Sequence, residues 1–217
     1  MPHRSEVYLH RETALRALCV FYDPSVDADF AVELGTDDET LEFPWQAPGG
    51  PRYCDLKRQP ELLGKIEEAR REPAMADFLT AVNSPLCALE TAKCDTWFSD
   101  ELNPEEDVFQ ACCKFGSYVD LIFSDKTQRF AFPEHERFAQ EIVRMLKRAP
   151  EMPAAAEFLI RRCYFHEGEG VHEGFYFTLY LFGYGDSEEE ARQRWSIGLT
   201  LAGHAIRQWS ARGPGSP

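Results

Sequence analysis

The sequence predicts an α+β fold with an antiparallel sheet, helices packed on one face of the sheet, and an amphipathic helix at the C-terminal end. Several short runs alternate apolar and polar residues, which is typical of strands with one buried face. Other stretches repeat apolar residues at helical spacing, and two segments of the chain resemble each other. Hydrophobic residues make up 44% and aromatic residues 13% of the 217 positions, so the composition supports a packed core and excludes the disordered class.

The two similar segments are Phe30–Pro44, FAVELGTDDETLEFP, and Val119–Pro133, VDLIFSDKTQRFAFP, which align without a gap. Each predicts a strand, a polar turn and a second strand. Weaker matches flank them in the same order, and they pair 17–21 with 111–115, 70–75 with 147–152, and 93–94 with 162–163. We therefore expect a duplication with two pseudo-symmetric halves, 1–105 and 106–217, in one compact unit. Each half is expected to run strand, strand, strand, helix, strand.

Two helices are expected inside these halves. The first lies near Pro60 to Arg71, because Pro60 suits a first helical turn and Pro73 would end the helix. The second starts after Pro133 and runs to about Arg148. Apolar residues recur along one face of each helix, and they are Leu62, Leu63 and Ile66 in the first and Phe138, Ile142, Met145 and Leu146 in the second.

The C-terminal region adds a strand and a helix. Phe175–Gly185, FYFTLYLFGYG, has bulky residues on both faces, which indicates a central strand covered at least in part on both sides. Asp186 or Ser187 is expected to cap a following helix, whose first turn carries three glutamates where negative charge suits the helix dipole. The predicted buried stripe of this helix is Ala191, Trp195, Leu199, Ala202, Ile206 and Trp209.

The net charge of −14 restricts the classes of partner. It argues against nucleic acid and against anionic membrane surfaces, because both attract Lys and Arg, and it permits a basic protein partner. The chain has no run of eighteen apolar residues, and its N-terminus lacks an apolar signal core. Seven cysteines without a CxxC pair indicate free thiols in a reducing compartment. We expect a soluble cytoplasmic protein.

The stretch HEGEGVHEG, His166–Gly174, is the most distinctive local motif. It lies between two predicted strands, so it reads as a hairpin tip in which His166 and His172 could face each other. Imidazole nitrogens with the carboxylates of Glu167, Glu169 and Glu173 would suit zinc. No HExxH helix or close cysteine pair completes a recognised metal pattern. We favour a solvated tip whose glutamates belong to a wider acidic surface.

A second acidic stretch, DTWFSDELNPEED, contains no basic residue. Its acidic residues are Asp95, Asp100, Glu101, Glu105, Glu106 and Asp107. It is either a solvated insertion or a docking loop for a basic partner, with Trp97 and Phe98 as apolar anchors. Nearby, Asp120 alternates with apolar residues in a predicted strand; we expect it on an open face, since a buried carboxylate would need a partner.

No phosphate-binding loop and no nucleophile elbow occurs, so neither a cofactor nor a catalytic residue is predicted. We expect an acidic cytosolic protein that binds and neutralises a basic protein partner, as an immunity protein or a DNA mimic does. The expected contacts are Trp97, Asp100, Glu101, Glu105, Glu106, Asp107, Glu167, Glu169 and Glu173. The alternative is a metal-dependent enzyme or small-molecule binder with a site between the halves that uses His166, His172, Glu173 and Asp120. A structural or assembly subunit is a third hypothesis.

Overall fold

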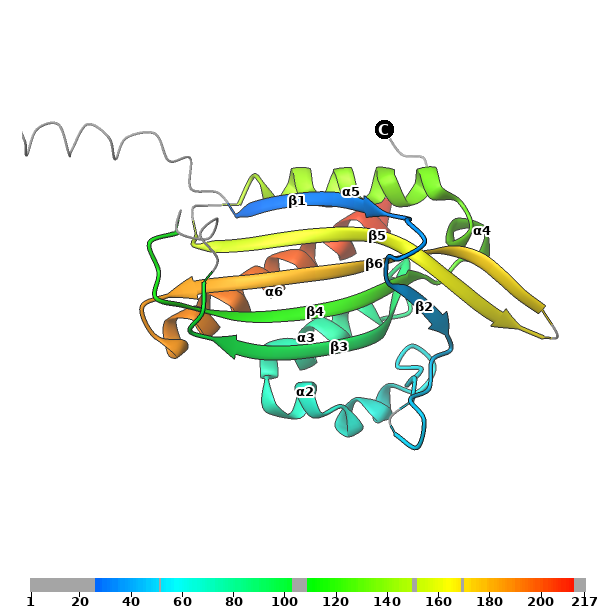
Figure 1. Cartoon of the computed structure of the whole chain (residues 1–217), viewed down its shortest axis with the longest axis horizontal. Coiled ribbons are helices and arrows are strands. Elements are labelled where there is room, and N and C mark those ends of the chain that lie inside the picture. Colours follow the sequence, from blue (N-terminus) through cyan, green and yellow to red (C-terminus); the bar gives the residue numbers. More distant parts are fainter. Residues whose placement is uncertain (1–25, 51, 103–108, 150–151, 169, 213–217) are drawn as a thin grey trace, which may run out of the picture.

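The computed structural model describes residues 26–50, 52–102, 109–149, 152–168 and 170–212, and its mixture of helices with one sheet confirms the α+β class (Figure 1). The strands are β1 Asp27–Glu33, β2 Thr40–Phe43, β3 Leu89–Ser99, β4 Cys113–Phe123, β5 Ala154–Glu167 and β6 Gly170–Gly185. The helices are η1 Pro60–Lys65, α2 Glu67–Arg71, α3 Pro73–Val82, α4 Lys126–Arg129, α5 Phe132–Leu146 and α6 Glu188–Arg212. The strand order is β1-β5-β6-β4-β3, and β2 also pairs with β5.

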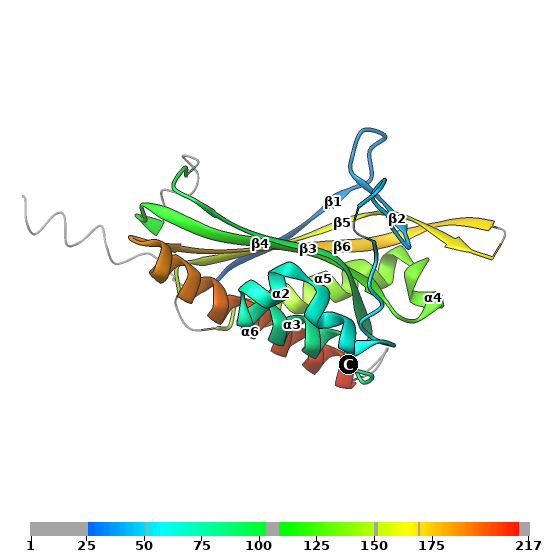
Figure 2. The same cartoon turned by 90° about the horizontal axis from the view of Figure 1, so that it is seen from below.

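The labelled helices all lie on one face of the sheet (Figure 2). Side chains alternate between the two faces along each strand, so every second residue of the central strands reaches these helices. The main core forms there, and its largest buried side chains include Phe123, Phe138, Phe158, Phe177 and Trp195. Within the described residues, the opposite face is covered at one end, where β2 and the residues after it bury a second cluster. That cluster consists of Leu41, Phe43, Ala92, Ile122, Cys163, Phe165 and Tyr176.

The two halves of the chain share this sheet. The N-terminal half supplies the strands at both edges, and the C-terminal half supplies β4, β5 and β6 in the centre. The predicted hairpin over Phe30–Pro44 is wrong, because β1 and β2 do not pair with each other. Both run parallel to β5, along Ala155–Arg161 and then along Arg162–Phe165. β5 is 14 residues long and has room for both strands on one edge, so the sheet is mixed rather than antiparallel.

The predicted hairpin over Val119–Pro133 is also wrong. Val119–Phe123 is the end of the long strand β4, and the chain then turns into two helices. The side chain of Asp125 caps α4 by accepting the Gln128 backbone N–H at 3.1 Å, and Pro133 lies in the first turn of α5. A cap and an N-terminal proline favour helix starts, and here they override the apolar alternation. The two similar segments therefore do not adopt the same structure.

Residues 60–71 form two short helices rather than the single predicted one. The chain is extended at Ile66, between η1 and α2. Pro73 begins α3 as well as following α2, which is consistent with its missing N–H, because the first helical turn leaves N–H groups unpaired anyway. The sequence prediction missed α3, whose buried residues are Met75, Phe78, Leu79 and Val82.

The last helix, α6, packs its buried stripe against the sheet. Glu188, Glu189 and Glu190 lie in its first turn, and Trp195 is fully buried. The Trp195 indole Nε1 donates a hydrogen bond of 2.8 Å to Ser117 Oγ on β4, which satisfies both buried polar groups. Among the described helices, none combines the length and apolar character needed to cross a membrane.

Candidate functional site

A row of aromatic side chains crosses the sheet face opposite the helices. It consists of Trp97 on β3, Tyr118 on β4, and Tyr180 and Phe182 on β6, all partly exposed. The ring centroids are 5.9 Å apart for Trp97 and Phe182, and 6.1 Å apart for Tyr118 and Tyr180. Gly116 makes room for this packing, because a Cβ there would lie 2.9 Å from both the Trp97 and Phe182 rings. Large, partly exposed aromatic side chains are the type enriched at protein interfaces.

Carboxylates flank the aromatic row on both sides. Glu157 of β5 stands opposite Tyr180 and beside Asp29 of β1, while Asp95 of β3 stands opposite Tyr118. All three carboxylates are exposed. Partial desolvation by the neighbouring strands, followed by the nearby charges of Glu33 and Asp29, raises the pKa of Glu157 above its usual range, so a cation placed here would be favourable. We call Trp97, Tyr118, Tyr180, Phe182, Asp29, Asp95 and Glu157 the aromatic–acidic face.

Two of the described cations on this side of the sheet, Arg161 and Lys114, already have partners. Arg161 is buried and pairs with Glu33 at 2.7 Å and Glu39 at 3.1 Å, and its guanidinium lies 5.9 Å from the Tyr180 ring centroid. Lys114 Nζ lies 5.3 Å from the centroid of the Phe182 ring. By contrast, no ion pair within the described residues involves the carboxylates of the aromatic–acidic face. Among the described residues, the face therefore presents negative charge without an ion-pair partner beside aromatic rings, which suits a cationic ligand group.

Some of the acidic contacts predicted from sequence lie near this face. Trp97 belongs to it, and Asp100 and Glu101 are exposed just beyond the end of β3. Glu105, Glu106 and Asp107 lie outside the described residues.

The β5–β6 hairpin, which carries Glu167 and Glu173, lies at the other end of the sheet (Figure 1). Glu157 and Glu167 are ten positions apart on β5, or about 33 Å at the usual strand rise. Glu167 pairs with Lys126 and Arg129, and Glu173 lies 3.4 Å from Arg162, so these charges are largely compensated. Glu169 lies outside the described residues. Glu167 and Glu173 therefore do not extend the aromatic–acidic face.

The two histidines of the hairpin do not face each other. His172 is paired with Phe165 and His166 with Val171, and these neighbouring positions on β5 point to opposite faces of the sheet. The prediction of facing imidazoles is therefore wrong, because the register is shifted by one residue. His166 Nε2 instead contacts the Glu42 carboxylate on β2. The residues that the structure describes contain no cluster of three or more His, Cys, Asp or Glu side chains able to hold a metal ion.

Asp120 is buried beneath the β1–β2 side of the same face, so the expectation of an open position is wrong. Its Oδ1 accepts a 2.8 Å hydrogen bond from Thr178 Oγ1, and Arg161 donates to that same hydroxyl at 3.2 Å. Burial, the largest influence, raises the pKa of Asp120 to about 7, against a partial lowering by Thr178. β2 and its flanking loops, remote in sequence, cover this end of the sheet, which the strand pattern alone does not reveal.

Replacing Asp120 with Asn is expected to stabilise the protein at pH 8 by on the order of 2 kcal/mol. The pKa of Asp120 in the folded protein is above its value of 3.8 in the free side chain, so the folded state binds the proton more tightly. The stabilising effect of that proton is complete below about pH 4 and is lost as the pH rises to about 7. Urea unfolding between pH 5 and 8 checks this.

The Asp120→Asn variant should lose the fall in stability between pH 5 and 8 that this carboxylate causes. His135 provides an internal reference, because burial lowers its pKa to about 4 and its effect has the opposite sign, with stability lost as the pH falls. An identical pH dependence in the variant and the wild type would contradict the account of Asp120.

A polar pocket of about 520 Å³ lies between the two halves of the chain. From the N-terminal half it is lined by Tyr53, Lys57 and Glu90 among others, and from the C-terminal half by Arg129 and His166 among others. Among these lining residues, the Arg129 guanidinium donates to Glu90 Oε1 at 2.7 Å and to the Phe123 carbonyl at 2.6 Å. This is where the structure brings His166 and Glu167 together with residues of the other half. Their charges are already satisfied by one another, so the pocket does not present a free acid or base.

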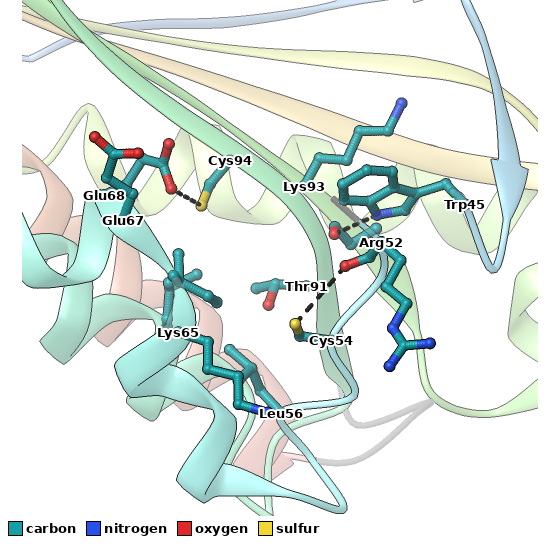
Figure 3. Close-up of a pocket in the computed structure, with 13 residues that line it drawn as sticks. Trp45, Arg52, Cys54, Leu56, Lys65, Glu67, Glu68, Thr91, Lys93 and Cys94 are labelled. Carbon is teal, nitrogen blue, oxygen red and sulfur yellow. Dashed lines mark hydrogen bonds between the residues drawn. The ribbon is translucent and has the colours of Figure 1, made fainter. Parts of the chain in front are cut away.

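A second pocket, of about 310 Å³, lies between β3 and the residues from Trp45 to Glu68 (Figure 3). Cys54 and Cys94 enter it from different elements (Figure 3). Cys94 Sγ lies 4.0 Å from Glu68 Oε2, and burial followed by the Glu68 charge raises the pKa of this thiol. A thiol beside a carboxylate stays protonated, so Cys94 does not have the electropositive setting of a nucleophilic cysteine.

The sequence prediction missed most of the aromatic–acidic face. The alternation of residues in Tyr176–Tyr184 could have indicated this face. One set of alternate positions includes the apolar residues Phe177, Leu179 and Leu181, and the other set contains three tyrosines. Such a difference indicates that one side of the strand is only partly covered, since a tyrosine hydroxyl needs water or a partner. Comparisons of the chain with protein-family models, curated proteins and solved structures find no match.

Proposed function

We propose that this protein binds a basic protein partner through the aromatic–acidic face and neutralises it, in the manner of an immunity protein or a nucleic-acid mimic. The observation that carries the proposal is the row of four partly exposed aromatic rings between exposed carboxylates, on a sheet face that no described helix covers. The overall charge of −14 supports it, because long-range attraction speeds association with a basic protein.

The chemistry of this face suits Arg and Lys side chains. A guanidinium can stack on an aromatic ring while its N–H groups reach a carboxylate, and the pairing of Tyr180 with Glu157 offers both within one cross-strand pair. The aromatic rings supply apolar area at a small cost in conformational entropy. The face thus combines anchors for affinity with charges for selectivity, the two parts of a typical interface hot spot.

A small-molecule site between the two halves is the second candidate function. The supporting observation is the pocket of about 520 Å³ that contains His166, Glu167 and the buried Arg129. Its ionic groups pair internally, so a ligand would have to displace an existing ion pair. For that reason the aromatic–acidic face is the stronger candidate.

Replacing Glu157 with Lys is expected to weaken binding of the native partner by about tenfold or more, because it places a cation where a partner cation binds. The full-length protein would be used as bait in lysate of its native host, with retained proteins identified by mass spectrometry and the eluate assayed for metal and small molecules. The affinity of the retained basic protein for each variant would then be measured directly.

The matched control is Asp77→Lys, which makes the same change of charge at an exposed position of α3, on the helical side of the molecule. It should change the affinity by no more than about twofold. Equal binding by both variants would remove the aromatic–acidic face from the interface. Retention of a stoichiometric small molecule with no protein would instead favour the pocket between the halves.

A further inference from the structure

The two edges of the sheet differ in how their backbone groups are satisfied. At the β3 edge, side chains from the preceding segment cap the outward carbonyls: Trp45 Nε1 donates to Ala92 at 2.7 Å and Lys57 Nζ donates to Leu89 at 2.7 Å. Arg71 similarly reaches the Thr96 carbonyl at 3.3 Å. Such capping prevents another strand from adding to that edge.

The β1 edge has no comparable cover among the described residues. β1 pairs with β5 on one side and is the last strand of the sheet on the other. The Phe30 N–H contacts the carboxylate of its neighbour Asp29 at 2.8 Å, which shows that this amide points away from β5. Because backbone groups alternate between the two sides of a strand, the amides of Ala28 and Val32 point outward as well. Among the described residues, β1 therefore offers outward backbone donors and acceptors to an added strand, which would take over the Phe30 N–H from the Asp29 carboxylate.

The side chains of β1 define what such a strand should look like. Asp27, Asp29 and Glu33 point to the same face as the aromatic row, since they pair with Ala155, Glu157 and Arg161. Phe30 and Val32 point to the helical face, and Val32 is 43% exposed. A neighbouring strand would place its own side chains beside these, in the same alternation.

We propose that β1 is the docking edge for an extended segment of the partner in which Lys or Arg alternates with apolar residues. The proposal rests on the proposed function and identifies how the partner is held. Cations of the added strand would lie beside Asp27 and Asp29, next to Glu157, and its apolar residues would cover Val32. Main-chain hydrogen bonds would supply affinity, as in other cases of strand addition, and the charge pattern would supply selectivity.

A second copy of this chain fits the edge poorly. Two β1 strands side by side would bring their Asp27 and Asp29 carboxylates together, and like charges across neighbouring strands destabilise a sheet. Charge complementarity therefore favours a basic strand over self-association.

The test uses the full chain and a synthetic peptide of about eight residues in which lysine and valine alternate, a length typical of strands. Hydrogen exchange of the Ala28, Phe30 and Val32 amides would be followed with and without the peptide. We expect exchange at these amides to slow by about tenfold or more when the peptide is bound. A peptide with the same sequence but N-methylated at alternate residues should bind about tenfold more weakly, since it keeps the charge and loses the edge hydrogen bonds.

Two variants provide an independent measurement. Val32→Pro removes an outward amide at an edge position where proline is tolerated, and it should weaken peptide binding by about tenfold, whereas Val32→Thr keeps the amide and should change it by no more than about twofold. Slow exchange of these amides in the free protein would show that another segment or a second copy already occupies the edge, and it would overturn the proposal. Equal binding of both peptides would also overturn it, while leaving binding by charge at the aromatic–acidic face intact. If Glu157→Lys lost the native partner while Val32→Pro still bound it normally, docking at the β1 edge would be overturned. Binding at the aromatic–acidic face would then stand on its own.

Discussion

Replacing Gly183 with Ala is expected to lower the free energy of unfolding by about 3 kcal/mol, because the new methyl group has no space. A Cβ at Gly183 would lie 2.2 Å from the Trp195 backbone nitrogen and 2.3 Å from the Ala191 carbonyl oxygen. Both atoms belong to the backbone of α6, so a side-chain rotation cannot relieve the contact. The helix would have to move away from β6, which would loosen the packing of the buried Trp195 ring. Urea denaturation of the purified variant measures the effect.

The control for this prediction is Gly64→Ala in η1, where an added Cβ meets nothing within 4 Å. That substitution should destabilise the protein by no more than about 0.5 kcal/mol. Alanine restricts the unfolded chain more than glycine does, and this effect favours the folded state. If Gly183→Ala and Gly64→Ala were equally stable, α6 would not pack on β6 as closely as described.

Replacing Arg129 with Met is expected to cost about 3 kcal/mol at neutral pH, because it leaves Glu90 buried without its cation. The side chains of both residues are almost fully buried, and the guanidinium also packs over the Phe43 and Phe165 rings, 5.7 and 5.2 Å from their centroids. Burial already raises the pKa of Glu90, and Arg129 is the group that most opposes this shift. The measurement is urea unfolding at several pH values.

The double variant Arg129→Met, Glu90→Gln is the decisive comparison, because it removes the stranded charge. It should recover more than half of the lost stability. The single variant should also recover stability on acidification, since a carboxyl group with a raised pKa in the folded state favours folding at low pH and loses that contribution as the pH rises. A double variant no more stable than Arg129→Met would show that the loss comes from packing around the guanidinium and not from the unpaired carboxylate.

The sequence alone was informative where the signal is local. Composition and apolar alternation predicted the α+β class, and the cap and spacing of the last helix predicted a span close to the observed Glu188–Arg212. The second helix was expected from after Pro133 to about Arg148, and α5 occupies Phe132–Leu146. Proline was harder to interpret, because the same residue can follow one helix and begin the next, as Pro73 does.

The sequence did not predict which strands pair with each other. The similarity of 30–44 to 119–133 suggested two hairpins, but a β-strand pattern states which residues alternate and not which strand lies beside them. The register of β5 with β6 likewise decided that His166 and His172 point to opposite faces, and one residue of shift would have reversed that result.

For the candidate site, too, the sequence predicted some features and the tertiary structure decided others. The excess of acidic charge and the presence of Trp97 in an acidic stretch can be read from the sequence itself, and the proposal of a basic partner rests on that charge. Only the tertiary structure decided which carboxylates lie beside the aromatic rings. Asp29, Asp95 and Glu157 come from three strands, and they lie near the rings only because β1, β5 and β3 flank β4 and β6 in the sheet. Glu167 and Glu173 of the hairpin instead form ion pairs at the far end. Long-range strand order determines such a surface, because residues distant in the chain become neighbours only through the pairing of whole strands.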